Sequence, residues 1–184
     1  YARCAPAPAG DYFALAPRPV ENHFCTYNAC GLSPKHAKDS RVPVKMDAPP
    51  GFKPLFRTSP VLDLIGPLYS RGEGKLLTIG LRAKAKHCNS RGTVHGGILA
   101  TLADVALGYT MAFSSDPPGN LVTANLSLDY AGSAKAGDWL ETHVDIQKQG
   151  SRLSFANCYI QVGDERIVRA SAVFLVARPA AAKS

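Results

Sequence analysis

The sequence lacks the features that mark several common classes of protein. Its five cysteines are odd in number and no two have the close spacing of a metal-binding knuckle, so we expect free thiols, a reducing compartment and no bound metal. The absence of internal repeats excludes a repeat architecture. Because no secretory signal is recognised, the expected location is cytoplasmic. The lysines have no accompanying aromatic stacking platform, which argues against a nucleic-acid partner.

The composition is that of a globular domain. Hydrophobic residues make up 46% of the 184 residues and charged residues 19%, which excludes a fully disordered or fibrous chain. A chain of this length can bury the core of one domain. The net charge of +7 suits an anionic partner, whether a nucleic acid, a membrane surface or a phosphorylated metabolite. Charge alone does not choose among these three.

Prolines separate the start of the chain from the rest. Six prolines interrupt residues 1–45, and no helical or strand period survives there. Met46 directly precedes the first globular sequence. We therefore expect residues 1–45 to be a disordered extension, or one derived from an expression vector or a mistranslated upstream region. The folded domain is predicted at residues 46–178, and residues 179–184 are predicted to form a C-terminal tail.

Helix signals occur at two places. Residues 59–66 combine a Ser59 cap, Pro60 in the first turn and Gly66 at the end, which predicts a short helix. Residues 95–115 are apolar almost throughout and are followed by a proline-rich turn, which predicts a long helix.

Alternating apolar and polar residues predict strands. The alternation first occurs in residues 74–86 and returns in four later runs, at residues 121–130, 138–149, 152–162 and 165–177. In the second run one face is expected to hold Val122, Ala124, Leu126, Leu128 and Tyr130. Short turns join the last three runs, so these must form antiparallel hairpins. The pattern is α+β, with one long helix inserted early into a meander of antiparallel strands.

The long helix carries charge only at Asp104 between Gly96 and Ser115. Its length could span a bilayer, but a central aspartate would cost roughly 2.5 to 3.5 kcal/mol there. A helix that is apolar on every side is a buried one, and the strands can cover it, so no membrane partner is expected. Asp104 shares a stripe with mostly small residues, which either permit close packing or let a ligand approach. In the first case Asp104 would pair with an arginine.

The start of this helix can bind a developing negative charge. Gly96 and Gly97 lie at the first turn, where amide groups lack intrahelical partners and the helix dipole is positive. Such donors form an oxyanion hole for a carbonyl under attack, typically worth about 2.7 to 4 kcal/mol per donor.

The spacing separates the two candidate groups. Asp104 lies eight residues beyond Gly96, which is about 12 Å along a helix axis. One chain therefore cannot present both groups to the same carbon atom. If both are catalytic, the site is shared between two subunits of a homodimer.

The residues "N-x5-HGG-x6-D", formed by Asn89, His95, Gly96, Gly97 and Asp104, are followed by "LVTANLSLDY" and "KQGSRLSF". Together they resemble the hotdog-fold acyl-CoA thioesterases of the phenylacetate-degradation (PaaI-like) type, over about residues 50–177. The resemblance implies a long central helix wrapped by a five- to six-stranded antiparallel sheet. It also implies homodimers with joined sheets that assemble into a homotetramer.

Carried over by position, the resemblance assigns roles to individual residues. Asp104 would be the base or nucleophile, and the Gly96 amide would polarise the thioester carbonyl. Asn89 would hold the attacking water or the thioester, and His95 would support the helix start and the ligand. Thr123 stands where close family members have a serine that places water. Its added methyl group restricts its rotamers.

Acyl-CoA would supply the anionic partner, and no other cofactor is expected. The resemblance places nucleotide contacts in residues 130–135 and 148–152. The candidate binding residues there are Tyr130, Lys135, Lys148, Gly150 and Arg152, and Gly97 at the helix start is a further candidate. The alternative is that these cations are solvated surface charges.

Other functions stay open at this point. A hydratase or dehydratase of acyl thioesters would need a histidine placed for proton transfer, and His95 is the candidate. A non-catalytic acyl-CoA-binding module would keep the pocket without the chemistry, although both Asn89 and Asp104 are present. A nucleophilic Cys88 lacks the partners that activate a thiol.

Overall fold

The computed structural model describes residues 47–177. The expectations for residues 1–45 and 179–184 fall outside this range. The two helices and two 3₁₀ turns are α1 (Pro60–Ile65), α2 (Gly96–Phe113), η1 (Gly74–Leu76) and η2 (Ala85–His87). The strands are β1 (Lys53–Pro54), β2 (Leu68–Arg71), β3 (Thr78–Arg82), β4 (Leu121–Tyr130), β5 (Trp139–Gln149), β6 (Leu153–Val162) and β7 (Glu165–Val176).

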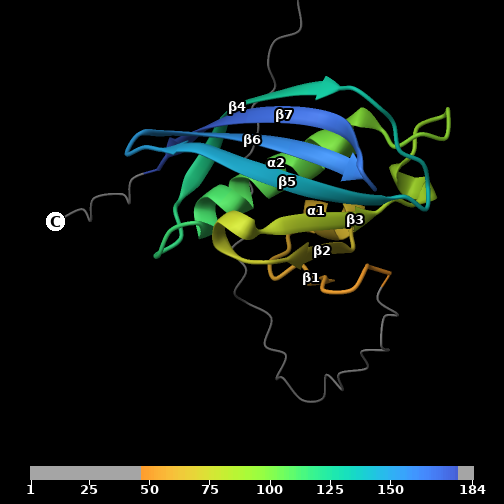
Figure 1. Ribbon diagram of the computed structural model, residues 1–184, viewed down its shortest axis with the longest axis horizontal. Coiled ribbons are helices and arrows are strands. Elements are labelled where there is room, and N and C mark those ends of the chain that lie inside the picture. Colours follow the sequence, from red (N-terminus) through yellow and green to blue (C-terminus); the bar gives the residue numbers. More distant parts are fainter. Residues whose placement is uncertain (1–46, 178–184) are drawn as a thin grey trace, which may run out of the picture. The chain divides into compact units, whose positions relative to one another are not determined.

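One antiparallel sheet contains all of these strands, in the order β1-β2-β3-β5-β6-β7-β4. Figure 1 shows the sheet curving across α2, which lies behind β5, β6 and β7 in this view. The α+β prediction and the hairpins that join β5, β6 and β7 are confirmed. The sheet has seven strands, whereas five or six were predicted. Strands β1 and β2 were not predicted because they are too short to show an alternating pattern.

The first predicted strand is shorter than residues 74–86. Only Thr78–Arg82 pair as β3, with Ile79 and Leu81 fully buried. Its ends turn away into η1 and η2. At η2 the reason is local, because the Lys84 amide donates to Nδ1 of His87 (2.9 Å) and so folds the chain into a turn.

The position and facing of β4 differ from a simple meander. After α2, the chain enters the sheet beside β7, at the edge opposite β1. A β-bulge at Ala124 then breaks the alternation, because Thr123 pairs with Phe174 and Asn125 with Val173. The predicted face is therefore wrong for Val122, which is 56% exposed beside Leu175. Thr123 takes the side that faces α2.

Helix α2 packs one face against the sheet. Its buried residues are Leu99, Leu102, Ala103, Ala106, Leu107, Thr110 and Met111. The opposite face, which includes Asp104, is only half-buried in the single chain. The sheet thus covers α2 on one side and leaves the side of the small residues accessible. Helix α2 is long and apolar enough to span a membrane, but in this structure it packs on the sheet.

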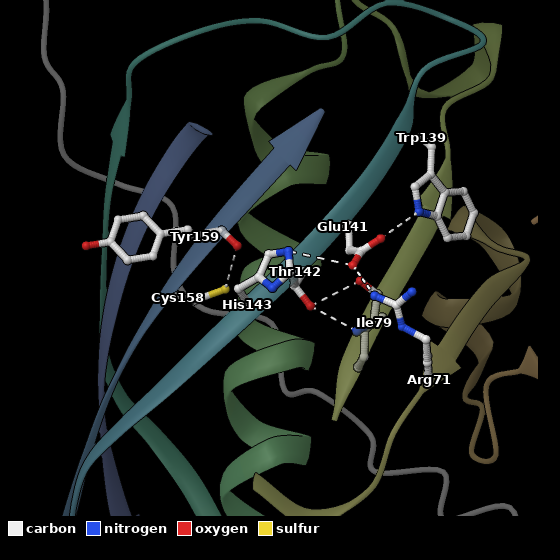
Figure 2. Close-up of polar contacts among 8 residues, drawn as sticks. All are labelled: Arg71, Ile79, Trp139, Glu141, Thr142, His143, Cys158 and Tyr159. Carbon is white, nitrogen blue, oxygen red and sulfur yellow. Dashed lines mark hydrogen bonds and ion pairs between the residues drawn. The ribbon is translucent and has the colours of Figure 1, made fainter. Parts of the chain in front are cut away.

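Two polar contacts fasten β5 to its neighbours (Figure 2). The buried Thr142 hydroxyl accepts from the Ile79 amide and donates to the Ile79 carbonyl, both at 3.0 Å. On the outer surface Arg71 forms an ion pair with Glu141 (2.6 Å), which also accepts from the Trp139 indole. These contacts attach β2 and β3 to the longer strands.

Candidate active site

A tight loop carries Asn89 to the start of α2. The Asn89 amide donates to the Thr93 carbonyl (2.8 Å), and Cys88 bridges to Val94. The Asn89 side chain accepts from the Arg91 amide (2.9 Å) and donates to the Thr93 hydroxyl (3.0 Å). A carboxamide nitrogen has two hydrogens, so one remains for a ligand. Asn89 both shapes the loop and presents a donor beside the helix start.

His95 caps α2. Its Nδ1 accepts from the Gly97 amide at 2.9 Å, which places the proton of a neutral ring on Nε2. The amides of Ile98 and Leu99 both donate to the His95 carbonyl. Among residues 47–177 the Gly96 amide has no acceptor. The predicted donor at Gly96 is therefore the one amide of the first turn left for a ligand, whereas that of Gly97 is occupied.

Tyr130 lies across the same helix start. Its hydroxyl donates to the Gly96 carbonyl (3.1 Å). A Cβ atom at position 96 would lie 3.3 Å from the Tyr130 ring. A glycine at this position leaves space for the ring and for an oxygen that approaches the amide.

The Asp104 carboxylate projects from the exposed side of α2 toward β4. It accepts from the Thr123 hydroxyl at 2.9 Å. The bulge in β4 makes this contact possible, since a regular strand would turn Thr123 away from the helix. Within residues 47–177 Asp104 forms no ion pair, so the alternative in which an arginine neutralises it finds no support there.

Asp104 and Thr123 line a cavity of about 340 Å³. Its other walls combine apolar and polar residues, namely Val105, Gly108, Tyr109, Ala112, Phe113, Gly119, Leu121 and Phe174 with Arg57 and Asn120. Phe56 packs on two of them, with ring centroids 5.9 Å from Tyr109 and 4.9 Å from Phe113. A carboxylate beside a pocket of this size can face the reactive carbon of a ligand whose apolar tail packs on the aromatic and aliphatic walls.

Sequence reasoning identified part of this cavity. Asp104 and Thr123 were expected at the site, and Tyr109 and Phe113 lie on the wall beside them. Arg57, Asn120 and Phe174 were missed. They come from a loop after β1, the turn before β4 and the end of β7, and no local pattern in the sequence connects these segments to Asp104.

The candidate residues form two groups along α2. The first, at the helix start, contains Asn89, His95, Gly96, Gly97, Tyr130 and Lys135, the last through its bridge to Thr93. The second contains Asp104 and Thr123. Gly150 lies in the β5–β6 turn between the exposed Lys148 and Arg152, and Gln149 in the same hairpin donates to Ser114 at the end of α2 (2.6 Å). The chain alone does not bring the helix start and Asp104 together.

Two cysteines lie in the described part of the chain, and neither belongs to the two groups above. Cys88 and Cys158 are free thiols. Burial raises the pKa of the Cys158 thiol to about 12, so it is not a nucleophile near neutral pH. The Cys88 thiol points to the Lys84 carbonyl. Within the described part of the chain no three histidine, cysteine or acidic side chains converge as a metal site would require.

Comparisons with known proteins place the chain among thioesterases. The family described as the thioesterase superfamily matches residues 91–168. A Pseudomonas aeruginosa protein with the provisional name esterase PA0474 is 51% identical over 130 residues, which cover 70% of this chain and 97% of that protein. Acyl-coenzyme A thioesterase 13 of Mus musculus is 33% identical over 78 residues, 42% of this chain and 54% of that protein.

The fold has a solved counterpart. The PaaI protein of the E. coli phenylacetic acid degradation operon is 17% identical, with a TM-score of 0.60 over 66% of this chain and 86% of its own. The architecture of a long helix against an antiparallel sheet is therefore the hotdog fold. Because the similarity to the Pseudomonas protein spans nearly all of that protein, and the family match includes the helix start, Asp104 and Thr123, the chain belongs to the thioesterase superfamily.

Proposed function

We propose that the protein hydrolyses acyl-CoA thioesters to a free acid and coenzyme A. The observation that carries this proposal is the Asp104 carboxylate, held by Thr123 at the wall of a cavity whose other side is formed by apolar residues such as Tyr109, Phe113 and Phe174. The name of the mouse relative, an acyl-coenzyme A thioesterase, supports the same substrate class. The cavity would receive the acyl group, with the thioester carbon near the carboxylate.

In the proposed reaction Asp104 takes a proton from water, whose oxygen attacks the thioester carbonyl carbon. The carbonyl oxygen becomes negative and accepts a hydrogen bond from the Gly96 amide. The carbon–sulfur bond then breaks, and the thiolate of coenzyme A leaves and takes up a proton. A thiol has a pKa near 8.5, so it departs with little help from an acid. Alternatively, Asp104 attacks the carbon itself, and water hydrolyses the resulting anhydride.

The remaining candidate residues position these groups. Asn89 would donate its second amide hydrogen to the water or the thioester, and His95 would hold the helix start through Gly97. Thr123 would orient the Asp104 carboxylate, and Tyr130 would cover the helix start. The reaction so written uses no metal and no cofactor beyond the coenzyme A of the substrate.

The site is proposed to be shared within a homodimer. Strand β4 forms the sheet edge, and its outer side has no strand partner among residues 47–177. A twofold axis beside this edge would join two sheets and run the two α2 helices antiparallel. The start of one α2 would then face Asp104 of the other, which removes the separation of about 12 Å. We further propose that two such dimers form a tetramer.

The same arrangement would assemble a binding site for the phosphates of coenzyme A. Lys135 lies with the helix start, whereas Lys148, Gly150 and Arg152 lie in the hairpin near the end of α2. Antiparallel helices would bring the first region of one copy toward the second region of the other. Cations on flexible side chains and free amides in turns are suited to bind phosphate.

A thiol-release assay over a panel of acyl-CoAs tests the proposal, with Asp104→Asn as the decisive variant. We expect kcat to fall by about 10² to 10⁴, because the amide cannot accept the proton. Asp145→Asn is the matched control, since Asp145 is exposed on β5 and its described hydrogen bond is to Gln147. Unchanged turnover in Asp104→Asn would exclude the mechanism. Binding of acyl-CoA without release of thiol would instead indicate a non-catalytic module.

A further inference from the structure

His87 is a buried histidine that no step of the proposed reaction uses. Only 1% of its surface is exposed. Its Nε2 lies 2.7 Å from the Ile65 carbonyl at the end of α1, and its Nδ1 accepts from the Lys84 amide at 2.9 Å. A carbonyl can only accept and an amide N–H can only donate. The ring is therefore neutral, with its proton on Nε2, and joins α1 to η2.

The backbone of His87 continues this connection to the candidate active site. Its carbonyl accepts from the His95 amide at 2.8 Å, which closes the base of the loop at residues 87–95. Within the loop, an antiparallel β-bridge pairs the backbones of Cys88 and Val94, and the Asn89 amide donates to the Thr93 carbonyl. Asn89 and the capping residue His95 thus stand on one small unit, and His87 fixes that unit to the core.

The other side of this unit is also attached. The Val94 amide donates to the Ala134 carbonyl (2.7 Å). Next to His87, Nζ of Lys86 donates to the carbonyls of Leu64 and Gly66, both at 2.8 Å. These bonds hold the loop and the end of α1, but His87 is the side chain that reaches from the base of the loop into the protein interior.

We propose that His87 is a positioning residue for thioester hydrolysis. By fixing the loop at residues 87–95, it holds the Asn89 carboxamide and the Gly96 amide at the separation that the developing oxyanion requires. This inference rests on the proposed function. An oxyanion donor acts only when it is aligned before the reaction, and a misplacement of about 1 Å can cost about a hundredfold in rate. The effect belongs to the transition state, so kcat should change more than KM.

Two substitutions at His87 test the proposal by steady-state kinetics. His87→Leu fills a similar volume and removes both side-chain bonds, whereas His87→Gln keeps a donor that can reach Ile65. In His87→Leu we expect kcat to fall about tenfold or more, with KM changed by less than about threefold. His87→Gln should recover part of kcat. Circular dichroism and melting temperatures establish that each variant is folded under the assay conditions.

Thr142→Val is the matched control, because it also removes two buried hydrogen bonds, but within the sheet (Figure 2). It should lower the melting temperature and leave kcat within about twofold of wild type. Amide hydrogen exchange of residues 88–97 supplies a second readout, and it should accelerate in His87→Leu but not in Thr142→Val.

Three outcomes would overturn the proposal. They are wild-type kcat in folded His87→Leu, unchanged exchange of residues 88–97 in that variant, and an equal loss of kcat in Thr142→Val. If the wild type releases thiol from no acyl-CoA, the proposed function fails, and the exchange measurement still decides whether His87 holds the loop.

Discussion

At the scale of single residues, the Asp104 carboxylate depends on one hydroxyl group for its orientation. Thr123 donates to it at 2.9 Å. The pair is exposed to solvent, so the bond contributes little to the stability of the fold. The bond also selects one rotamer of a side chain that is otherwise free to turn in a half-open cavity. Thr123 therefore makes the carboxylate a group of defined direction.

Thr123→Val should separate this orienting role from packing. Valine has nearly the same shape and no hydroxyl, so we expect kcat to fall about tenfold while the melting temperature changes little. Thr123→Ser keeps the hydroxyl and should retain most of the activity. The kcat values of both variants with one acyl-CoA provide the measurement. Equal activity in the valine and serine variants would show that the hydroxyl does not matter.

At the scale of elements, two irregular segments shape the site. The bulge in β4 turns Thr123 toward α2. The 3₁₀ turn η2 places His87 between α1 and the loop that leads to α2. β-bulges commonly re-aim a side chain next to an active site. In both segments a departure from regular structure positions the polar groups, while the regular strands supply the core.

The η2 junction also predicts how stability depends on pH. Burial lowers the pKa of His87 below its ordinary value of 6.5, and the nearby Lys84 and Lys86 lower it further, against the opposing effect of the bond to Ile65. Between the two pKa values the unfolded chain binds more protons than the folded chain. The free energy of unfolding should therefore decrease as the pH falls below about 6.5. The decrease should stop once the pH is below the pKa of His87 in the folded protein.

Chemical denaturation at several pH values between about 5 and 8 measures this dependence. His87→Gln should show a weaker loss of stability at acid pH, because glutamine does not titrate. The four other histidines of the chain are present in both proteins, so the difference between the two curves reports on position 87. The same slope in wild type and variant would contradict the assignment to His87.

At the scale of the whole molecule, the chain carries two candidate catalytic groups at different heights on one helix. The Gly96 amide and the Asp104 carboxylate are about 12 Å apart along α2. Strand β4, whose outer edge has no strand partner among residues 47–177, contacts Asp104 through Thr123. The proposed shared site would account for the small-residue face that the apolar helix leaves open in the single chain. Catalysis and assembly would then depend on the same surface.

Subunit mixing tests the shared site directly. Asp104→Asn and Gly96→Val should each be inactive alone, the second because the added side chain collides with Tyr130 and blocks the amide. After subunit exchange, half of the dimers are mixed, and each mixed dimer regains one intact site. Activity should return to about a quarter of the wild-type value. No recovery, with exchange verified by native mass spectrometry, would place both groups in one subunit's site.

How much could be predicted from sequence varies with the range of the interactions. The cap at Ser59, the limits of α2 and the hairpins of β5 to β7 follow from residues close together in the chain, and the structure confirms them. The edge position of β4 and the wall residues Arg57 and Phe174 depend on contacts between distant segments. Neither hydrophobic periodicity nor a capping residue in the sequence indicates such contacts.

The sequence by itself determined the α+β class, the one acid on an apolar helix and the glycines at its start, because hydrophobic period, capping and helix rise are local properties. The tertiary structure alone decided that Thr123 meets Asp104 and that the buried His87 ring meets the Ile65 carbonyl at the end of α1. The bulge changes the facing of β4 at Val122 and Thr123, and a histidine is buried only if donors and acceptors satisfy it. Both conditions arise when the sheet closes over α2.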